Sequence, residues 1–266
     1  MKRANWMIGA IILGFTQLCC AALGDFSFNA RVNSMGKAFT AVTDGVTGLA
    51  WNPASIAELE RLELSSSSFD LFGLGLSCSY ISGCASIGKN GFGFSYSKVS
   101  DSIFPYEEST LSMVLAHGFS KIKVGTALNI FRMESYENGQ GLGMDFGFLY
   151  EYPLKSGNLN FGLKLNNLFS KVSYTTGTIE ELKESSLIGI AYIKPRKVLV
   201  SMDIGREELN FGFRCFLSNN FSFQVGSDNG KPACGFTISK SGWDLDYAYL
   251  THSLGNSKRF SINKKF

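Results

Sequence analysis

The sequence predicts an all-β fold: a transmembrane antiparallel β-barrel of about fourteen strands, with a short helical N-terminal segment in its lumen. Three observations support this prediction. They are a composition rich in strand formers, a regular alternation of apolar and polar residues, and connections of two different lengths. The 266 residues include 23 Phe, 10 Tyr and 29 Gly but 5 Pro, and 18% are charged. Aromatic residues favour strands, and glycine in a strand marks a bend or a close approach.

Apolar and polar residues alternate along most segments after residue 61. In GMDFGFLYE, Met144 and Phe146 share one face and Asp145 lies on the other, and LNFGLKLNN, LNFGFRCF and WDLDYAYL repeat the pattern. A soluble sandwich would turn the apolar face inward, whereas a transmembrane barrel turns it toward lipid. The polar face carries charges of both signs: Lys123, Asp145, Lys164, Arg214, Asp244 and Asp246. This mixture suits a wet or hydrogen-bonded lumen and favours the barrel.

The alternation places the strands and their connections along the chain. Strands are expected near residues 61–69, 74–86, 91–99, 108–118, 121–132, 140–151, 157–167, 186–194, 197–205, 207–216, 219–227, 231–239, 242–251 and 258–266. Short turns such as GKNG and SKSG alternate with longer connections such as VSDSIFPYEE and the stretch from Leu168 to Ser185. Outer-membrane barrels show this asymmetry, with short turns in the periplasm and longer loops outside.

Residues 1–24 are expected to be a Sec signal peptide that is cleaved after Gly24. They combine a basic start, the apolar run WMIGAIILGF, and small residues Ala22 and Gly24 before the cleavage site. An uncleaved N-terminal anchor is the alternative. No later run is long enough for a membrane-spanning helix, so a membrane location requires a barrel. The final segment RFSINKKF ends on Phe266 in the apolar phase and resembles the C-terminal strand by which the barrel-assembly machinery recognises its substrates. We therefore expect a bacterial outer-membrane location, in contact with outer-membrane lipid.

Other functional classes have weak support in the sequence. The formal net charge is +3, and no run of Lys and Arg forms a stripe for nucleic acid. The chain has two histidines, His117 and His252, and no nucleophile-elbow sequence, so we expect no enzyme activity. Neither a cofactor nor a metal is expected, because the cysteines fit no zinc pattern.

Four cysteines follow the signal peptide: Cys78, Cys84, Cys215 and Cys234. The alternation places all four on the apolar face, so we predict that they are small lipid-facing residues. Cys78 and Cys84 are expected on one strand, roughly 20 Å apart at the rise per residue of a strand, which is too far for a disulfide. Bridges between strands stay possible, and the redox state of the four thiols is open.

Residues 25–60 interrupt the alternation before the expected barrel, residues 61–266. The stretch ARVNSMGKAFTAVTDGVTGLAWNPASIAEL predicts two short helical pieces, residues 35–42 and 45–51, the second stopped by Pro53. A barrel of this size has room for such a segment in its lumen. A plug is one interpretation, and a periplasmic tail that caps the barrel is the other.

The stretch SMGKAFTAVTDGVTGLAWNPASIAELE resembles the N-terminal motif of FadL-like outer-membrane barrels, including the PorV-like branch and the small barrels of spirochaetes. The matching positions include Met35, Gly36, Asp44, Trp51, Asn52 and Pro53. The resemblance implies that these residues belong to a hatch in the lumen. It also implies passive uptake of hydrophobic small molecules, chiefly long-chain fatty acids, with lateral exit through the wall. The alternative that it implies is a PorV-like barrel that docks or shuttles secreted proteins without transporting small molecules.

Ligand capture and lateral exit have candidate residues. Aromatic and apolar side chains in two expected outer loops are candidates for capture, or else for an interfacial girdle: Phe104, Tyr106, Leu168, Phe169, Val172 and Tyr174. Gly91 and Gly93 in the third strand are candidates for the lateral opening. The lining of the lumen should separate the two functions. A continuous apolar channel past the hatch favours transport, whereas a lumen filled by Arg214, Asp244 and Asp246 networks favours a docking scaffold.

Overall fold

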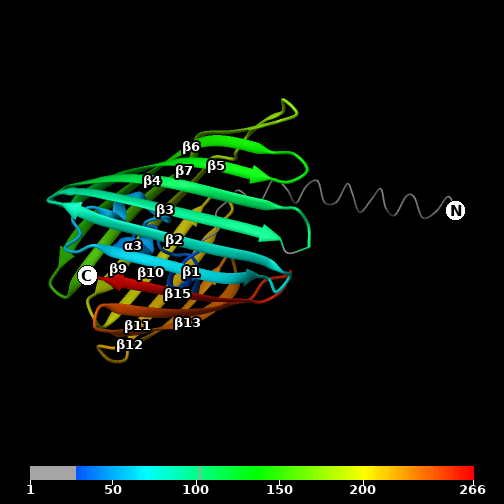
Figure 1. Ribbon diagram of the computed structural model, residues 1–266. Helices are drawn as coiled ribbons and strands as arrows, with labels where there is room; N and C mark the ends of the chain where they lie inside the picture. Colours follow the sequence, from blue (N-terminus) through cyan, green and yellow to red (C-terminus); the bar gives the residue numbers. More distant parts are fainter. Residues whose placement is uncertain (1–27, 102) are drawn as a thin grey trace.

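A closed antiparallel barrel forms most of the molecule (Figure 1). The computed structural model describes residues 28–101 and 103–266, so the expected signal peptide and its cleavage site lie outside the described residues. Within them, fifteen strands form one sheet, and an additional pairing of β6 with β7 closes fourteen of them into the barrel. The short β8 pairs with β7 alone and lies outside the ring. The predicted fold class and the predicted strand number are confirmed.

The strands agree closely with the expected ranges. The strands are β1 (Glu63–Leu71), β2 (Leu76–Ile87), β3 (Asn90–Asp101), β4 (Glu107–Phe119), β5 (Ile122–Glu134), β6 (Gly139–Leu154), β7 (Gly157–Tyr174), β8 (Ile179–Glu181), β9 (Ser185–Lys194), β10 (Val198–Gly205), β11 (Leu209–Phe216), β12 (Phe221–Asp228), β13 (Lys231–Lys240), β14 (Trp243–Leu250) and β15 (Ser257–Lys265). Within the described part of the chain, three short helices precede them: α2 (Ala30–Ser34), α3 (Gly45–Gly48) and the 3₁₀ turn η2 (Pro53–Ile56). α3 falls within the helical piece expected at residues 45–51. The helical piece expected at residues 35–42 is wrong, because α2 ends at Ser34 and a turn with Gly36 at a positive φ follows it. None of the described helices is long and apolar enough to cross a membrane.

The barrel is polar inside and apolar outside. Inward-facing residues that are buried include Ser65, Ser82, Asn129, Asn160, Ser201, Gln224, Thr237 and Asn263. Outward-facing residues that are exposed include Phe92, Phe94, Met113, Leu115, Leu128, Ile130, Ile188, Phe211, Phe213, Leu245 and Phe260. A soluble sandwich would show the reverse arrangement. In water, apolar side chains on the outer surface would be exposed to solvent, which is unfavourable, so they would lie in the core. The arrangement is that of a barrel whose outer surface faces lipid.

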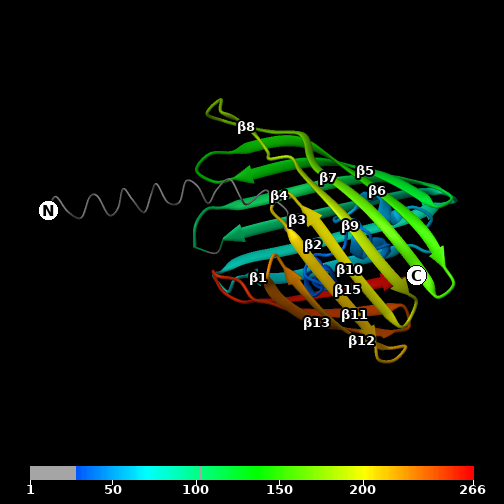
Figure 2. The same ribbon diagram turned by 180° about the vertical axis from the view of Figure 1, so that it is seen from behind.

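The two ends of the barrel differ. At one end, here the turn end, lie the short turns after β2, β4, β6, β9, β11 and β13 together with the C-terminus (Figure 1). At the other end, the loop end, lie the connections after β1, β3, β5, β10, β12 and β14. The β7–β8 hairpin also lies there and extends beyond the barrel rim (Figure 2). The long outer loop expected at residues 168–185 is therefore mostly strand, because β7 continues to Tyr174.

Aromatic side chains cover the outer wall near the C-terminus. Phe236 and Tyr247 lie with ring centroids 5.4 Å apart, and Tyr247 and Phe260 lie 5.0 Å apart, across neighbouring strands. Lys264 follows in the same outward phase, where an apolar residue would be usual. Its ammonium bends over the Trp243 ring at 4.8 Å and donates to the Ser241 carbonyl at 3.0 Å. The charged group can thus reach the turn end while its stem packs on apolar surface.

The wall has one irregular seam among the described strand pairs, between β6 and β7. The register shifts between Leu142 and Met144 and again between Met144 and Phe146. Opposite the shifts, Asn167 and Phe169 have φ of 57° and 55°, a conformation that costs a residue with a side chain about 1 kcal/mol or more. The Asp145 carboxylate accepts a hydrogen bond from the Asn167 amide at 2.8 Å, so the broken ladder does not leave that donor unpaired.

The prediction for the cysteines is correct for two of the four. Cys215 and Cys234 lie in the outward phase of β11 and β13, but Cys78 and Cys84 are buried on the inner face of β2. The reason lies in the serines of β1 and β2. Because serines occupy both faces of these two strands, polarity does not mark which side faces the lumen.

Candidate functional site

Residues 28–62, here the lumen segment, occupy the interior of the barrel (Figures 1 and 2). The segment is mostly buried up to Ala57 and contacts inward-facing residues all round the wall, whereas residues 60–62, just before β1, are exposed. Asn29 caps α2, because its Oδ1 accepts from the Arg31 amide at 2.9 Å. The Asn29 amide group then donates to Ser65 and to Asn263 of the wall, both at 3.3 Å. The lumen therefore holds a folded plug, and the interpretation as a cap outside the barrel is wrong for the described residues.

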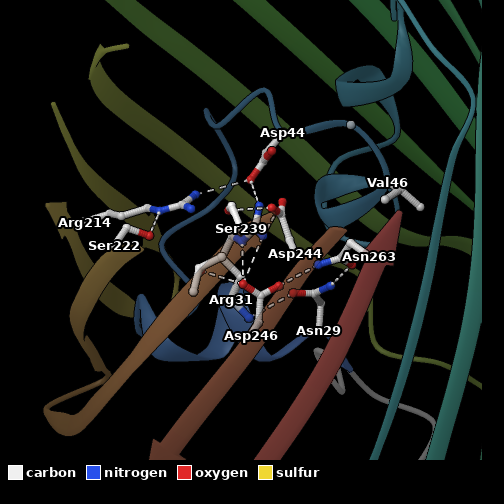
Figure 3. A network of polar contacts seen from close by, with 12 residues as sticks. Asn29, Arg31, Asp44, Val46, Arg214, Ser222, Ser239, Asp244, Asp246 and Asn263 are labelled. Carbon is white, nitrogen blue, oxygen red and sulfur yellow. Dashed lines mark hydrogen bonds and ion pairs between the residues drawn. The ribbon is translucent and has the colours of Figure 1, made fainter. Parts of the chain in front are cut away.

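A buried group of charges holds one side of the lumen segment (Figure 3). Arg31 donates to Asp44 at 2.7 Å within the segment, and to Asp244 at 2.9 Å and Asp246 at 3.0 Å on β14. Two further cations surround Asp44: Arg214 at 3.7 Å and Lys265 at 3.4 Å. We call Arg31, Asp44, Arg214, Asp244, Asp246 and Lys265 the ionic cluster. It joins α2, the loop before α3 and three wall strands.

The pKa values within the lumen segment follow from this geometry. Burial by itself raises the pKa of Asp44, but the charges of Arg31, Lys265 and Arg214, with the hydrogen bond from Arg31, hold that pKa well below its usual range. Burial lowers the pKa of Arg31, and the three surrounding carboxylates raise it well above its usual value. Both groups are therefore charged at neutral pH, and each compensates the burial of the other.

Apolar contacts hold the opposite side. Val46, Leu49 and Ile56 of the lumen segment pack in one cluster with Cys84, Val114, Ala116 and Ala127 of β2, β4 and β5. Glycines let the segment lie directly against this wall. A Cβ at Gly125 would lie 2.4 Å from the Pro53 carbonyl carbon, and one at Gly91 would lie 2.2 Å from the Ile56 carbonyl oxygen. The inward glycines are thus explained by close approach of a second backbone.

Polar anchors fix the middle of the segment. Asp203 on β10 accepts from the amides of Phe39 and Thr40, both at 2.9 Å. The Trp51 indole donates to the Thr40 hydroxyl at 3.3 Å, and its ring lies 4.0 Å from the Lys164 ammonium of β7. Asn52 donates to the Thr40 carbonyl at 2.6 Å and accepts from the Ala54 amide at 3.0 Å, which starts the η2 turn at Pro53. The Trp-Asn-Pro turn therefore fixes the fold of the plug.

A cavity of about 320 Å³ lies at the loop end, between the lumen segment and the wall. We call it the loop-end pocket. Lys37 and Trp51 of the lumen segment line it, together with residues from the ends of β1, β12, β13, β14 and β15. The lining mixes aromatic and aliphatic side chains with charges of both signs.

The predicted hatch residues come together in the lumen. Met35 is buried against Trp51 and Phe39, and Gly36 has a φ of 59° at a point where a Cβ would overlap the Ser227 backbone. Asp44 belongs to the ionic cluster, and Trp51, Asn52 and Pro53 form the central turn. These six residues share a buried position, apart from the half-buried Asp44, and all contribute to the fold of the plug.

The structure distributes the other predicted residues differently. Phe104 and Tyr106 lie in the β3–β4 connection, but Leu168, Phe169, Val172 and Tyr174 are on β7, where Val172 faces inward and Phe169 is 79% exposed. None of these six lines the loop-end pocket. β3 pairs with β2 and β4 along its whole length, so Gly91 and Gly93 mark contact with the plug and no opening. The register shifts of the wall lie between β6 and β7, which stay paired on both sides of them.

Sequence reasoning missed the residue at the centre of the site, Arg31. Lys265, Asp203 and Lys164 were not recognised as contacts of the plug either. One signal for Arg31 was present: an arginine among small and apolar residues must be paired once those residues are buried. Its partners could be narrowed to the inward acidic residues, among them Asp244 and Asp246, but sequence alone does not say which ones lie nearby.

The fold and the occupied lumen define a class: a closed antiparallel barrel with an N-terminal plug. Among solved structures, the chain is similar to the toluene transporter TbuX of Ralstonia pickettii, with a TM-score of 0.63 and 11% identity over 90% of this chain and 98% of that one. It is also similar to the CymD monoaromatic hydrocarbon channel, with a TM-score of 0.65 and 13% identity over 90% and 98%. For the toluene transporter TodX of Pseudomonas putida, the TM-score is 0.59 and the identity 11% over 89% and 96%. No family model and no curated protein sequence matches the chain.

Proposed function

We propose that this protein is an outer-membrane channel that takes up small, largely hydrophobic molecules by passive diffusion. One observation carries the proposal: an inside-out barrel whose plugged lumen keeps a pocket open at the loop end, between plug and wall. A pocket of this kind can hold a small molecule before it passes the plug or the wall. The similar structures support the proposal, since TbuX and TodX are toluene transporters and CymD is a monoaromatic hydrocarbon channel.

The orientation follows from the connections. Short turns lie in the periplasm in barrels of this kind, so the loop end and its pocket face the outside. The apolar outer wall, with Lys264 bent toward the turn end, is consistent with a position in the bacterial outer membrane. The Sec signal peptide and the contact with the barrel-assembly machinery stay predictions from residues 1–24 and from Phe266.

Long-chain fatty acids are the ligand that the sequence resemblance implies. The loop-end pocket supports a smaller molecule, because about 320 Å³ is at the lower end of ligand pockets and the lining is only partly apolar. We therefore propose a compact hydrophobic ligand as the main cargo and keep fatty acids as a competitor in the test.

A second candidate function is the docking of secreted proteins at the outer membrane. The ionic cluster favours it, because charged side chains fill the lumen beside the plug and leave no continuous apolar channel there. The loop end also exposes apolar side chains that a partner could cover: Ile103, Phe104, Tyr136, Phe169 and Ile179. A docking scaffold would bind a partner without binding small ligands in the pocket.

A binding and conductance experiment separates the two functions. The purified barrel is titrated with a fluorescent long-chain fatty acid, with toluene and with a short-chain acid as competitors. Channel conductance is recorded for the wild type and for Trp51→Ala/Asn52→Ala. We expect saturable binding that toluene reduces, and higher conductance in the double variant, because the turn that fixes the plug is lost. Trp243→Ala on the outer wall is the control. Absence of binding to a folded barrel would favour the docking function.

A further inference from the structure

The loop-end pocket offers two aromatic surfaces. The Trp51 ring belongs to its lining from the plug side. On the wall side, Phe72 stacks on His252 with ring centroids 4.4 Å apart and an interplanar angle of 25°. Flat surfaces of this kind bind a planar aromatic ligand through offset stacking. A flexible alkyl chain would gain less from them.

Positive charge exceeds negative charge around these rings. Lys37, Lys231 and Arg259 line the pocket together with two carboxylates, Asp228 and Glu208. Lys37 and Asp228 form an ion pair at 2.8 Å, so they compensate each other. Lys231 makes no ion pair within 4.0 Å with a described carboxylate. It enters the pocket from the start of β13, at the rim.

His252 responds to the same excess of positive charge. It lies in the connection between β14 and β15 and lines the same pocket as Lys231, Lys37 and Asp228. Burial lowers the pKa of His252, the two lysines lower it further, and Asp228 raises it by less. The imidazole is therefore neutral at neutral pH, so its ring acts as an aromatic surface and leaves the cationic role to the lysine and arginine side chains.

We propose that the loop-end pocket binds a small aromatic carboxylate. The ring of the ligand lies between Trp51 and the Phe72–His252 stack, and its carboxylate pairs with Lys231 at the rim. This inference rests on the proposed function and narrows its cargo. A neutral hydrocarbon would cover the polar groups of the lining without pairing them, which costs binding free energy. An aromatic amine would meet the excess of positive charge.

Intrinsic fluorescence can test the proposal because tryptophan is rare in the chain. The three tryptophans are Trp6, Trp51 and Trp243. In the variant Trp6→Phe/Trp243→Phe, emission comes from Trp51 alone, which lines the pocket. The full-length protein carrying these changes is titrated in detergent with benzoate, toluene and benzylamine, which share a ring and differ in charge.

We expect saturable quenching by benzoate, with a Kd at least about tenfold lower than those of toluene and benzylamine, as one charge-assisted contact predicts. Lys231→Gln should weaken benzoate binding about tenfold and leave toluene binding unchanged. Lys171→Gln is the matched control, since Lys171 pairs with Glu181 on the β7–β8 hairpin and does not line the pocket. Toluene binding as tight as benzoate binding, or no effect of Lys231→Gln, would overturn the inference and leave the proposed function standing. Failure of all three ligands to bind a folded barrel would overturn both.

Discussion

The two sides of the plug meet the barrel wall through different physics. Toward β11, β14 and β15, Arg31 and Asp44 make charge-assisted contacts between 2.9 and 3.7 Å with fixed partners. Toward β2, β4 and β5, Val46, Leu49 and Ile56 make apolar contacts that have no preferred direction. Charged contacts define one position and fail abruptly when a partner is lost. Apolar contacts tolerate small shifts at low cost.

The difference indicates which part of the plug could move. The ionic side fixes α2 and the loop before α3 through several buried charges. By contrast, α3 and η2 meet the wall mainly through apolar side chains and through backbone contacts at glycines, with single hydrogen bonds from the Val46 amide to Glu63 and from Ser86 to the Ile56 carbonyl. Any rearrangement that opens the lumen should therefore start at η2 and pivot on Arg31. Changes on the two sides should accordingly differ in size and in kind.

Arg31→Ala should have the largest effect. It leaves Asp44, Asp244 and Asp246 buried without their main counter-charge, a loss of about 3–5 kcal/mol for a broken buried pair. The barrel itself should stay folded, because its strands pair without Arg31. We expect a large increase in single-channel conductance and protease cleavage within residues 28–62.

The matched control for this variant removes the carboxylates as well. In Arg31→Met/Asp244→Asn/Asp246→Asn, the two wall carboxylates are removed together with the arginine, so β14 keeps no buried negative charge without a counter-charge at these positions. Conductance should therefore fall back toward the wild-type value. If Arg31→Ala and the triple variant conduct as little as the wild type, the ionic cluster does not hold the plug.

Gly125→Ala should have a smaller effect on the other side. The added Cβ would lie 2.4 Å from the Pro53 backbone, so η2 must move away, at a cost of about 1–3 kcal/mol. We expect a lower melting temperature of the plug, measured by near-ultraviolet circular dichroism, with a modest rise in conductance. Gly83→Ala is the control, because its Cβ would meet the flexible ends of Leu64 and Phe94 on the outer wall. Equal effects of the two changes would contradict a close contact at Gly125.

The comparison also explains what the sequence could predict. The barrel was predictable because period-2 alternation is a local property of each strand, and β6, β7, β11 and β14 show it clearly. The plug was predictable from the Trp51-Asn52-Pro53 turn, which is local as well. Its partners were not, because Arg31 and Asp246 are 215 residues apart and meet only after the barrel closes.

The errors in the prediction have a related cause: the local sequence does not show what lies next to a residue in the folded barrel. Cys78 and Cys84 were placed on the outer face, since the serine-rich strands β1 and β2 give no contrast between faces. Gly91 and Gly93 were assigned to a wall opening, whereas the backbone of Ile56 and the side chain of Leu49 lie against them. A glycine in a strand indicates that something approaches closely, and the sequence does not say what.

Acid should have the smallest effect on the ionic side. Because the pKa of Asp44 lies below its unfolded value of about 3.9, its contribution to stability is complete above that range and is lost only as the pH falls through the lowered folded value. The hold of the ionic cluster on the plug should therefore be the same at pH 7 and at pH 5, and conductance that depends on this cluster should rise only well below pH 4. Asp44→Asn, which lacks the titrating group, should conduct more at neutral pH and change less with acid. An increase in wild-type conductance between pH 7 and pH 5, with the barrel still folded by circular dichroism, would mean that a different group controls the plug.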